Sequence, residues 1–407
     1  MRIIYTILLI VILTISFSKA QWQQVNSGLP GTSVFGLATD GQYIYAGTSN
    51  AGVYRSSNQG NNWTSANSGL PSSNAWELFS NNDTLFVGFN GPGAFRSTDH
   101  GNTWDTLTVG TLNSSVRGFI SNDKYLFAAT WGNGVFRSSD GGDNWSVINN
   151  GLNYLTFWDI ISLGDTLLAA DNGGGIYRST NNGNNWTQSN AGITSLITHR
   201  LTTLGNYIFV GTSNGGVFRS SDSGINWEQV GLTSQTIWAL LAYDTLLFAG
   251  TSSAGIFISY DYGNSWLTFN EGNPLGPVVE LMYDSTYIYA ATLAGGVYRY
   301  NKDNITSADE ISTLIPNAFK LYQNYPNPFN PTTKIKYTIP DVGSGLAMTL
   351  LKVYDILGNE VVTLVNDYKT AGSHEVEFNA DHLASGIYFY KLQAGSFVET
   401  KKMILMK

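Results

Sequence analysis

The sequence contains no cysteine, and only 12% of its 407 residues are charged. Disulfides and thiolate metal sites are therefore excluded, and apolar packing must hold the fold together. The four histidines, at positions 100, 199, 374 and 382, are scattered and predict neither a metal site nor a cofactor. Lysine and arginine number 21 against 29 aspartate and glutamate, a net charge of −8, so nucleic acid and anionic lipid are not expected partners.

Long apolar runs are also missing, except at the N-terminus. Arg2 precedes an uncharged apolar stretch over residues 3–17, and small residues follow before Ala20. This order is typical of a secretory signal peptide over residues 1–20. The alternative, an uncleaved anchor, would need a longer stretch to span a bilayer. Cleavage removes Arg2 and Lys19, takes the formal charge from −8 to −10, and leaves no predicted transmembrane anchor.

Glycine and aromatic residues are abundant, and they recur with a period. The chain has 44 Gly, 23 Tyr, 20 Phe and 11 Trp, a composition that favours an all-β protein with tight turns. A motif, Ser-x-Asp/Asn-x-Gly-x-x-Trp, occurs six times. Its first five copies start 41 residues apart, and the last follows after 39. About forty residues with four short strands per unit predict a β-propeller. The copies are 56–63, 97–104, 138–145, 179–186, 220–227 and 259–266.

The tryptophans predict the number of blades. Trp22 lies 41 residues before Trp63 and is followed by a similar segment, so it is expected to end a motif whose beginning is missing. The strands near Tyr287 and Tyr300 lack a motif, so the N-terminal strand is expected to complete their sheet and close the ring. Seven blades over residues 21–303 are therefore predicted from Trp22, Trp63, Trp104, Trp145, Trp186, Trp227 and Trp266.

The motif resembles the Asp-box, or BNR, repeat, in which it forms the turn between the third and fourth strands of a blade. The acidic or amide residue can accept hydrogen bonds from turn amides, and the glycine can adopt positive φ. We therefore expect these residues to be structural, and likewise the arginines that recur in register. The motif positions with an acceptor oxygen are Asn58, Asp99, Asp140, Asn181, Asp222 and Asp261.

Two enzyme families share this repeat. Resemblance to sialidases would imply three clustered arginines, but only Arg117 and Arg200 lie outside the repeating register after the signal peptide. Resemblance to xyloglucan-degrading glycosidases would imply facing carboxylates in a cleft between two propellers, whereas this chain has one propeller. Asp159, Asp171 and Glu280 are the carboxylates to consider, but their separation cannot be derived from the sequence. No catalytic residue is predicted.

One position of the repeat varies among large side chains. It lies 20 residues after the first serine of each motif and enters the innermost strand, where it should face the mouth of the central channel. We hypothesise that these residues, with Trp131 from a neighbouring loop, bind a glycan or a peptide. The alternative is that they plug the channel. The candidates are Phe35, Trp76, Arg117, Trp158, His199, Trp238 and Trp131, with Val279 in the last repeat.

The composition changes after residue 303. A linker over residues 304–316 precedes a segment with period-2 alternation over 317–407, which predicts a small Ig-like β-sandwich. Six strands are expected, at 334–339, 350–354, 360–364, 374–379, 386–392 and 396–403.

This segment resembles the type A sorting domain of type IX secretion in its Pro-rich entry (325–331), the segments 353–361 and 383–390, and its basic end (401–407). The resemblance implies export through the periplasm by the type IX machinery, to the cell surface or the medium, with the final residues as the signal. The sequence therefore predicts an exported, non-enzymatic binding or scaffold protein with an unknown surface ligand. The alternatives are a secreted glycoside hydrolase, or an assembly factor like the photosystem-assembly propellers that share the repeat.

Overall fold

The structure is a computed structural model. The predicted signal peptide (1–20) and most of the predicted linker lie outside the residues that it describes. Those residues are 21–31, 33–108, 115–271, 276–305, 318–340, 346–370 and 372–406.

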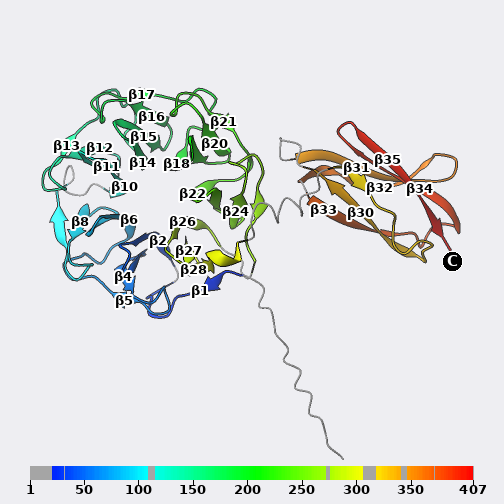
Figure 1. The fold of residues 1–407 in the computed structure, drawn as a ribbon, viewed down its shortest axis with the longest axis horizontal. Helices are drawn as coiled ribbons and strands as arrows, with labels where there is room; N and C mark the ends of the chain where they lie inside the picture. Colours follow the sequence, from blue (N-terminus) through cyan, green and yellow to red (C-terminus); the bar gives the residue numbers. More distant parts are fainter. Residues whose placement is uncertain are drawn as a thin grey trace, which may run out of the picture.

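Residues 21–305 form seven four-stranded antiparallel sheets in the described part of the chain, and Figure 1 shows these sheets arranged in a ring. The innermost strands of neighbouring sheets contact each other all the way round, because β26 contacts both β22 and β2. These strands are β2 (Val34–Thr39), β6 (Ala75–Asn81), β10 (Ser115–Ser121), β14 (Phe157–Leu163), β18 (Thr198–Leu204), β22 (Ile237–Tyr243) and β26 (Val278–Tyr283).

The remaining strands follow outward in the same order. The second strands are β3 (Ile44–Thr48), β7 (Thr84–Phe89), β11 (Leu126–Trp131), β15 (Thr166–Asp171), β19 (Tyr207–Thr212), β23 (Leu246–Thr251) and β27 (Tyr287–Thr292). The third strands are β4 (Gly52–Ser56), β8 (Ala94–Ser97), β12 (Gly134–Ser138), β16 (Gly175–Ser179), β20 (Gly216–Ser220), β24 (Ile256–Ser259) and β28 (Gly296–Asn301), which a 3₁₀ turn (Lys302–Asn304) follows. The outer strands are β5 (Thr64–Ser65), β9 (Asp105–Leu107), β13 (Ser146–Val147), β17 (Thr187–Gln188), β21 (Glu228–Gln229), β25 (Leu267–Thr268) and β1 (Gln23–Gln24).

The first described strand completes the last sheet. β1 pairs with β28, with Gln24 opposite Tyr298. Trp22, only 2% exposed, packs against Phe269 and Tyr300 at centroid distances of 5.8 and 5.6 Å. Joining the two ends of the chain segment in one sheet leaves no unpaired edge between the first and last repeats.

The six motifs form one recurring turn, which we call the box turn. In the second one, the Ser97 hydroxyl donates to Asp99 Oδ1 (2.8 Å) and accepts from Gly101 N (2.8 Å), while Asp99 Oδ1 also accepts from Thr103 N (2.9 Å). Burial opposes ionisation of Asp99, but the hydrogen bonds from Thr103 and Ser97 outweigh it and lower its pKa to about 2. Equivalent bonds occur in all six turns, so the acceptor residues are engaged in the turn itself.

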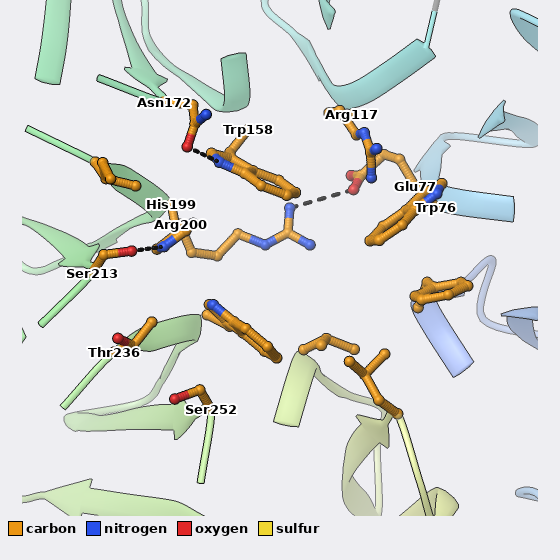
Figure 2. A pocket seen from close by; sticks show the side chains of 15 residues that line it. Trp76, Glu77, Arg117, Trp158, Asn172, His199, Arg200, Ser213, Thr236 and Ser252 are labelled. Atoms are coloured by element: carbon orange, nitrogen blue, oxygen red, sulfur yellow. Dashed lines mark hydrogen bonds and ion pairs between the residues drawn. The ribbon is translucent and has the colours of Figure 1, made fainter. Parts of the chain in front are cut away.

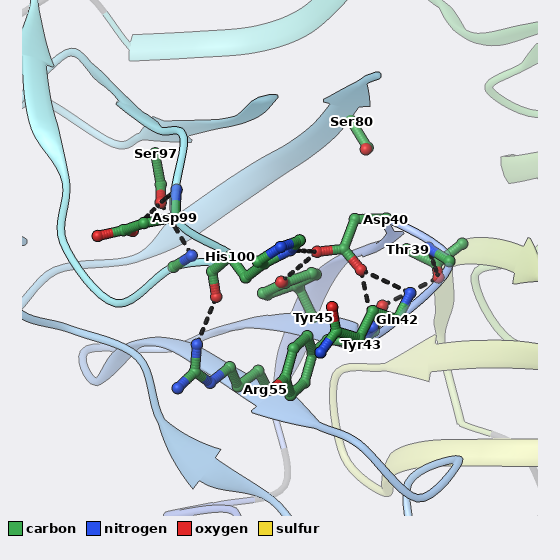
Figure 3. A network of polar contacts seen from close by, with 12 residues as sticks. Thr39, Asp40, Gln42, Tyr43, Tyr45, Arg55, Ser80, Ser97, Asp99 and His100 are labelled. Atoms are coloured by element: carbon green, nitrogen blue, oxygen red, sulfur yellow. Dashed lines mark hydrogen bonds and ion pairs between the residues drawn. The ribbon is translucent and has the colours of Figure 1, made fainter. Parts of the chain in front are cut away.

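Side chains from the box turns and third strands join neighbouring sheets. Arg55 on β4 donates to the His100 carbonyl in the next box turn (2.5 Å), and the His100 ring contacts Asp40 (Nδ1 to Oδ2, 2.8 Å), as Figure 3 shows. Asp40 also accepts from the Tyr45 hydroxyl (2.6 Å). The other in-register arginines likewise donate to a carbonyl of the following turn: Arg96, Arg137, Arg178, Arg219 and Arg299.

The motif tryptophans make a second inter-sheet link, with one exception. Trp186 Nε1 donates to the Ile148 carbonyl of the preceding sheet at 2.7 Å. Trp145 differs, because its Nε1 donates to Gly142 of its own box turn (2.9 Å) and its ring is half-buried. The tryptophans that reach the preceding repeat are Trp22, Trp63, Trp104, Trp186, Trp227 and Trp266.

The C-terminal domain has two sheets around one core. A three-stranded sheet has the order β29-β30-β33, and a four-stranded sheet the order β32-β31-β34-β35. Its core includes Phe329, Tyr390 and Met403. Seven strands are present rather than the expected six, because the short β29 was not predicted. The strands are β29 (Lys320–Leu321), β30 (Thr332–Ile339), β31 (Leu346–Tyr354), β32 (Glu360–Thr370), β33 (Gly372–Asn379), β34 (Gly386–Ala394) and β35 (Phe397–Leu405).

Candidate functional site

A β-bulge interrupts each of the seven innermost strands at the variable position. In β6, for example, Ala75 and Glu77 pair with consecutive residues of β7, so Trp76 is the extra residue. A bulged residue is released from the sheet's alternation and can be turned in a new direction. The bulged residues are Phe35, Trp76, Arg117, Trp158, Trp238 and Val279, and in β18 the bulge contains His199 and Arg200.

These residues surround one cavity of about 450 Å³, which we call the axial pocket. All seven innermost strands contribute to its lining, so the pocket lies on the axis of the ring. Figure 2 shows Trp76, Arg117, Trp158 and His199 around this common space. The pocket is also lined by Glu77, Asn172, Ile197, Arg200, Ser213, Thr236, Ser252 and Leu293.

Trp131 is the one candidate that is absent from this lining. It stands at the end of β11, 37% exposed, with its ring centroid 4.7 Å from that of Trp158 in an edge-on arrangement. The guanidinium carbon of Arg117 lies 5.4 Å from the Trp131 ring. Trp131 therefore extends the aromatic cluster toward solvent rather than lining the cavity.

The aromatic rings of the pocket differ in how far neighbours cover them. Phe35 stacks on Trp76 (4.1 Å between centroids, 22° between planes), and the Arg117 guanidinium lies 3.8 Å from the Trp76 ring centroid. Trp76 is therefore contacted by two flat groups. Trp238, half-buried, has no ring or cation contact within the described ranges, so it offers the least occupied aromatic surface in the pocket.

Arg117 is buried without hydrogen-bond partners. Its side chain is 9% exposed, and its Nε and Nη1 find no acceptor among the residues that the structure describes. Burial lowers its pKa to about 10, against the opposing attraction of Glu77, so the guanidinium remains charged at neutral pH. Leaving two N–H groups of a buried cation without acceptors costs free energy, and a ligand that supplies acceptors would remove this cost.

A second set of residues, each one position after the variable position, forms a charged cluster that the sequence analysis missed as a group. Glu77, Asp159, Arg200 and Glu280 occupy this position in four repeats. The other three repeats have Gly36, Gly118 and Ala239 there. A Cβ at Gly36 would stand 2.7 Å from the Trp76 carbonyl oxygen, so little room exists between adjacent inner strands. This cluster could have been found in the sequence, because the position holds either a charged residue or a small one in every repeat.

Arg200 is the centre of this charged cluster. Its Nη1 lies 3.3 Å from Glu77 Oε2 and 3.8 Å from Asp159 Oδ1, and its Nη2 contacts Glu280. Figure 2 shows the Arg200 side chain reaching toward Glu77. Burial raises the pKa of both Glu77 and Asp159, against the attraction of Arg200. Both acids therefore take up protons more readily than exposed carboxyls do.

His199 and Asp171 have identifiable hydrogen-bond partners. His199 bonds Ser213 (Nε2 to Oγ, 2.8 Å), and burial lowers its pKa to about 4, so the ring is neutral at pH 7. Asp171, considered above as a catalytic carboxylate, is fully buried and accepts from Thr156 N (3.0 Å) and Gly174 N (2.7 Å), which makes it a turn residue. No group of three or more His, Asp or Glu suited to a metal ion occurs in the part of the chain that the structure covers.

Comparison with protein families gives two matches. Residues 323–406 match the secretion system C-terminal sorting domain. The chain carries a type IX sorting domain. It is therefore exported to the cell surface or secreted. Residues 159–304 match the DUF6242 β-propeller domain. Within the described residues, no helix has the length and apolar character to span a bilayer.

Solved structures show similar folds at low sequence identity. PorZ, a surface component of the type IX secretion system of Porphyromonas gingivalis, is 16% identical with a TM-score of 0.55; the match covers 94% of this chain and 60% of PorZ. This chain thus spans less than two thirds of PorZ. YCF48 bound to D1 peptide is 15% identical (TM-score 0.58; 70% of this chain, 98% of that one).

A third structure is a GH74 xyloglucanase from Xanthomonas campestris, 13% identical with a TM-score of 0.56, where the match covers 87% of this chain and 63% of the enzyme. No curated protein matches the chain significantly. At these identities the three solved structures support the fold alone.

Proposed function

We propose that this sorting-domain protein is a seven-bladed Asp-box propeller that binds a ligand in the axial pocket without enzymatic turnover. In this proposal residues 1–20 are the signal peptide, 21–303 the propeller, 304–316 a linker, and 317–407 an Ig-like sorting sandwich that engages the type IX machinery. The observation that supports a binding role is the axial pocket itself: seven bulges direct non-repeating side chains into one cavity. Purely structural positions in a repeat protein have no reason to vary in this way.

The ligand is a glycan or a peptide. The pocket combines aromatic side chains with a few polar groups, and its volume lies within the usual range for ligand sites of about 300–1,000 Å³. Phe35, Trp76, Trp158 and Trp238 all keep intermediate exposure, so solvent reaches the aromatic lining. Solved structures of similar fold include one with a bound peptide and one of a polysaccharide-degrading enzyme, and both ligand classes are therefore worth screening.

Glycan and peptide arrays probed with the full chain would test the proposal. Trp158→Ala and Trp238→Ala should each abolish the signal, because each removes an aromatic surface of the pocket. Tyr283→Ala is the matched control, since Tyr283 is an exposed aromatic at the other end of β26. Equal binding by wild type and both tryptophan variants would remove the axial pocket from the proposal.

The alternative is a secreted glycoside hydrolase, and one observation favours it. Glu77 lines an aromatic pocket and its pKa is raised by burial, as a general acid requires. Against this, Arg200 engages Glu77 itself as well as Asp159 and Glu280, and the described lining of the pocket contains no second carboxylate to act as base or nucleophile. Incubation with polysaccharides, followed by an assay for new reducing ends, separates the two: Glu77-dependent release of reducing ends would establish the hydrolase.

A further inference from the structure

The axial pocket contains a buried cation, Arg117, whose N–H groups can bind an anion. Arg117 is about nine-tenths buried, lines the cavity, and has two N–H-bearing nitrogens without an acceptor among the described residues. Its guanidinium carbon lies over the Trp76 ring, 3.8 Å from the centroid, and 5.2 Å from the Trp158 ring centroid. Cation–π contacts orient the group but do not satisfy its N–H donors. The Nε–H and Nη1–H groups point to different sides of the guanidinium, and each can donate to an anionic oxygen such as that of a carboxylate.

The charges that face Arg117 decide whether a carboxylate could approach it. Arg200 is positive and already contacts three acidic side chains, whereas Arg117 has no carboxylate in hydrogen-bonding contact among the residues that the structure describes. Burial favours the neutral form of Glu77, the acid whose charge acts on Arg117. His199, the remaining titratable group of the pocket lining, is neutral at pH 7. Glu77 already bonds Arg200 (3.3 Å), so Nε and Nη1 of Arg117 stay open to an acceptor from a ligand.

The rest of the lining suits a sugar ring better than a peptide. Trp238 provides an aromatic surface without a ring or cation partner in the described part of the chain, and flat faces of this kind stack on sugar rings. Ser252, Thr236 and Asn172 also line the cavity. The Thr236 hydroxyl already bonds Asn214, whereas the Ser252 hydroxyl and the Asn172 amide can exchange hydrogen bonds with sugar hydroxyls. An apolar slot for a peptide side chain would not need this many small polar groups.

We propose that the axial pocket binds a hexuronate unit of an acidic glycan, with its carboxylate on Arg117 and its ring beside Trp238. This inference rests on the proposed binding function and adds the chemistry of the ligand. The burial that keeps Arg117 unpaired in the free protein makes its pairing with the ligand carboxylate strongly favourable.

Calorimetric titration of the full chain with oligogalacturonate, and with the same oligosaccharide as its neutral methyl ester, tests the inference without any substitution. The acid is expected to bind at least tenfold more tightly than the ester. Arg117→Met should abolish this preference, whereas Arg117→Lys, which keeps the charge but not the fork, should retain part of it. The wild-type comparison stands even if a variant folds poorly.

Peptides with a free or an amidated C-terminus form the second arm of the experiment. Binding of the free-acid peptide that depends on Arg117, with no binding of oligogalacturonate, would overturn the sugar assignment. Equal affinity for acid and ester in the wild type would refute the carboxylate contact and leave the proposed binding function intact. Failure of every glycan and peptide to bind would count against the proposed function itself.

Discussion

Replacing Trp186 with phenylalanine should weaken the propeller by removing an inter-sheet bond. Trp186 is 3% exposed, and its Nε1 donates to the buried Ile148 carbonyl of the preceding sheet at 2.7 Å. Phenylalanine keeps much of the apolar contact but leaves that carbonyl without a donor, which costs about 1–3 kcal/mol. The lost ring volume adds roughly 1 kcal/mol, so we expect about 2–4 kcal/mol in the free energy of unfolding.

Trp145→Phe is the matched control within the same chain. Trp145 is half-buried and bonds only Gly142 of its own box turn, so its loss separates no sheets and should cost about 1 kcal/mol or less. Urea unfolding of the full chain, followed by far-UV circular dichroism, measures both variants. The Trp186 variant should show the clearly lower midpoint. Equal midpoints, or a lower one for the Trp145 variant, would refute the inter-sheet role of the indole bond.

Three further predictions concern charge. Burial raises the folded-state pKa of Glu77 above its unfolded value of about 4.5. The contribution of Glu77 to stability is therefore complete below pH 4.5 and is lost as the pH rises through the folded-state pKa. Glu77→Gln should flatten the pH dependence of the unfolding free energy between these two pKa values. Arg200→Met leaves two buried carboxylates, Glu77 and Asp159, and the partly buried Glu280 without their cation, and should cost about 3–5 kcal/mol at pH 8. Partial recovery is expected at pH 5, where the acids protonate, and a pH-independent loss would contradict this. Lys402, exposed on β35, should be needed for export if the basic end is the signal: Lys402→Glu should retain the protein in the periplasm in cell fractionation, while Lys336→Glu, an exposed change on β30, should not.

Deleting residues 401–407 would also remove the expected signal, but it would be a poorer test of export than these substitutions. Met403 and Leu405, within that segment, are buried in the core of the C-terminal domain, and β35 pairs with β34 along its length. Truncation would therefore damage the fold as well as the signal. Exchange of an exposed lysine changes the charge and leaves the core intact.

The repeat was predictable because its period is visible in the residues themselves. The serine, acceptor, glycine and tryptophan recur at constant spacing, and each segment forms the same turn. The exception is Trp145, whose motif matches the others in sequence although its indole bonds Gly142 of its own turn. The short β29 was missed for a related reason: two residues have no period to detect.

The sequence identified the residues at the variable position, but not the bulges that direct them or the charged cluster beside them. Variation at one position of the repeat indicated seven residues, one in each repeat, as candidates. All seven line one pocket. The bulges that aim them could not be derived, because a bulge depends on the pairing register between strands. The cluster around Arg200 was missed as a group because its acids lie far apart in sequence and meet only when the ring closes.

A crystal structure of the full chain soaked with oligogalacturonate tests the central claim most directly. The account predicts a sugar ring beside Trp238 with its carboxylate within hydrogen-bonding distance of Nε or Nη1 of Arg117. Sugar bound elsewhere on the propeller, or an axial pocket left unoccupied at saturating ligand, would contradict it.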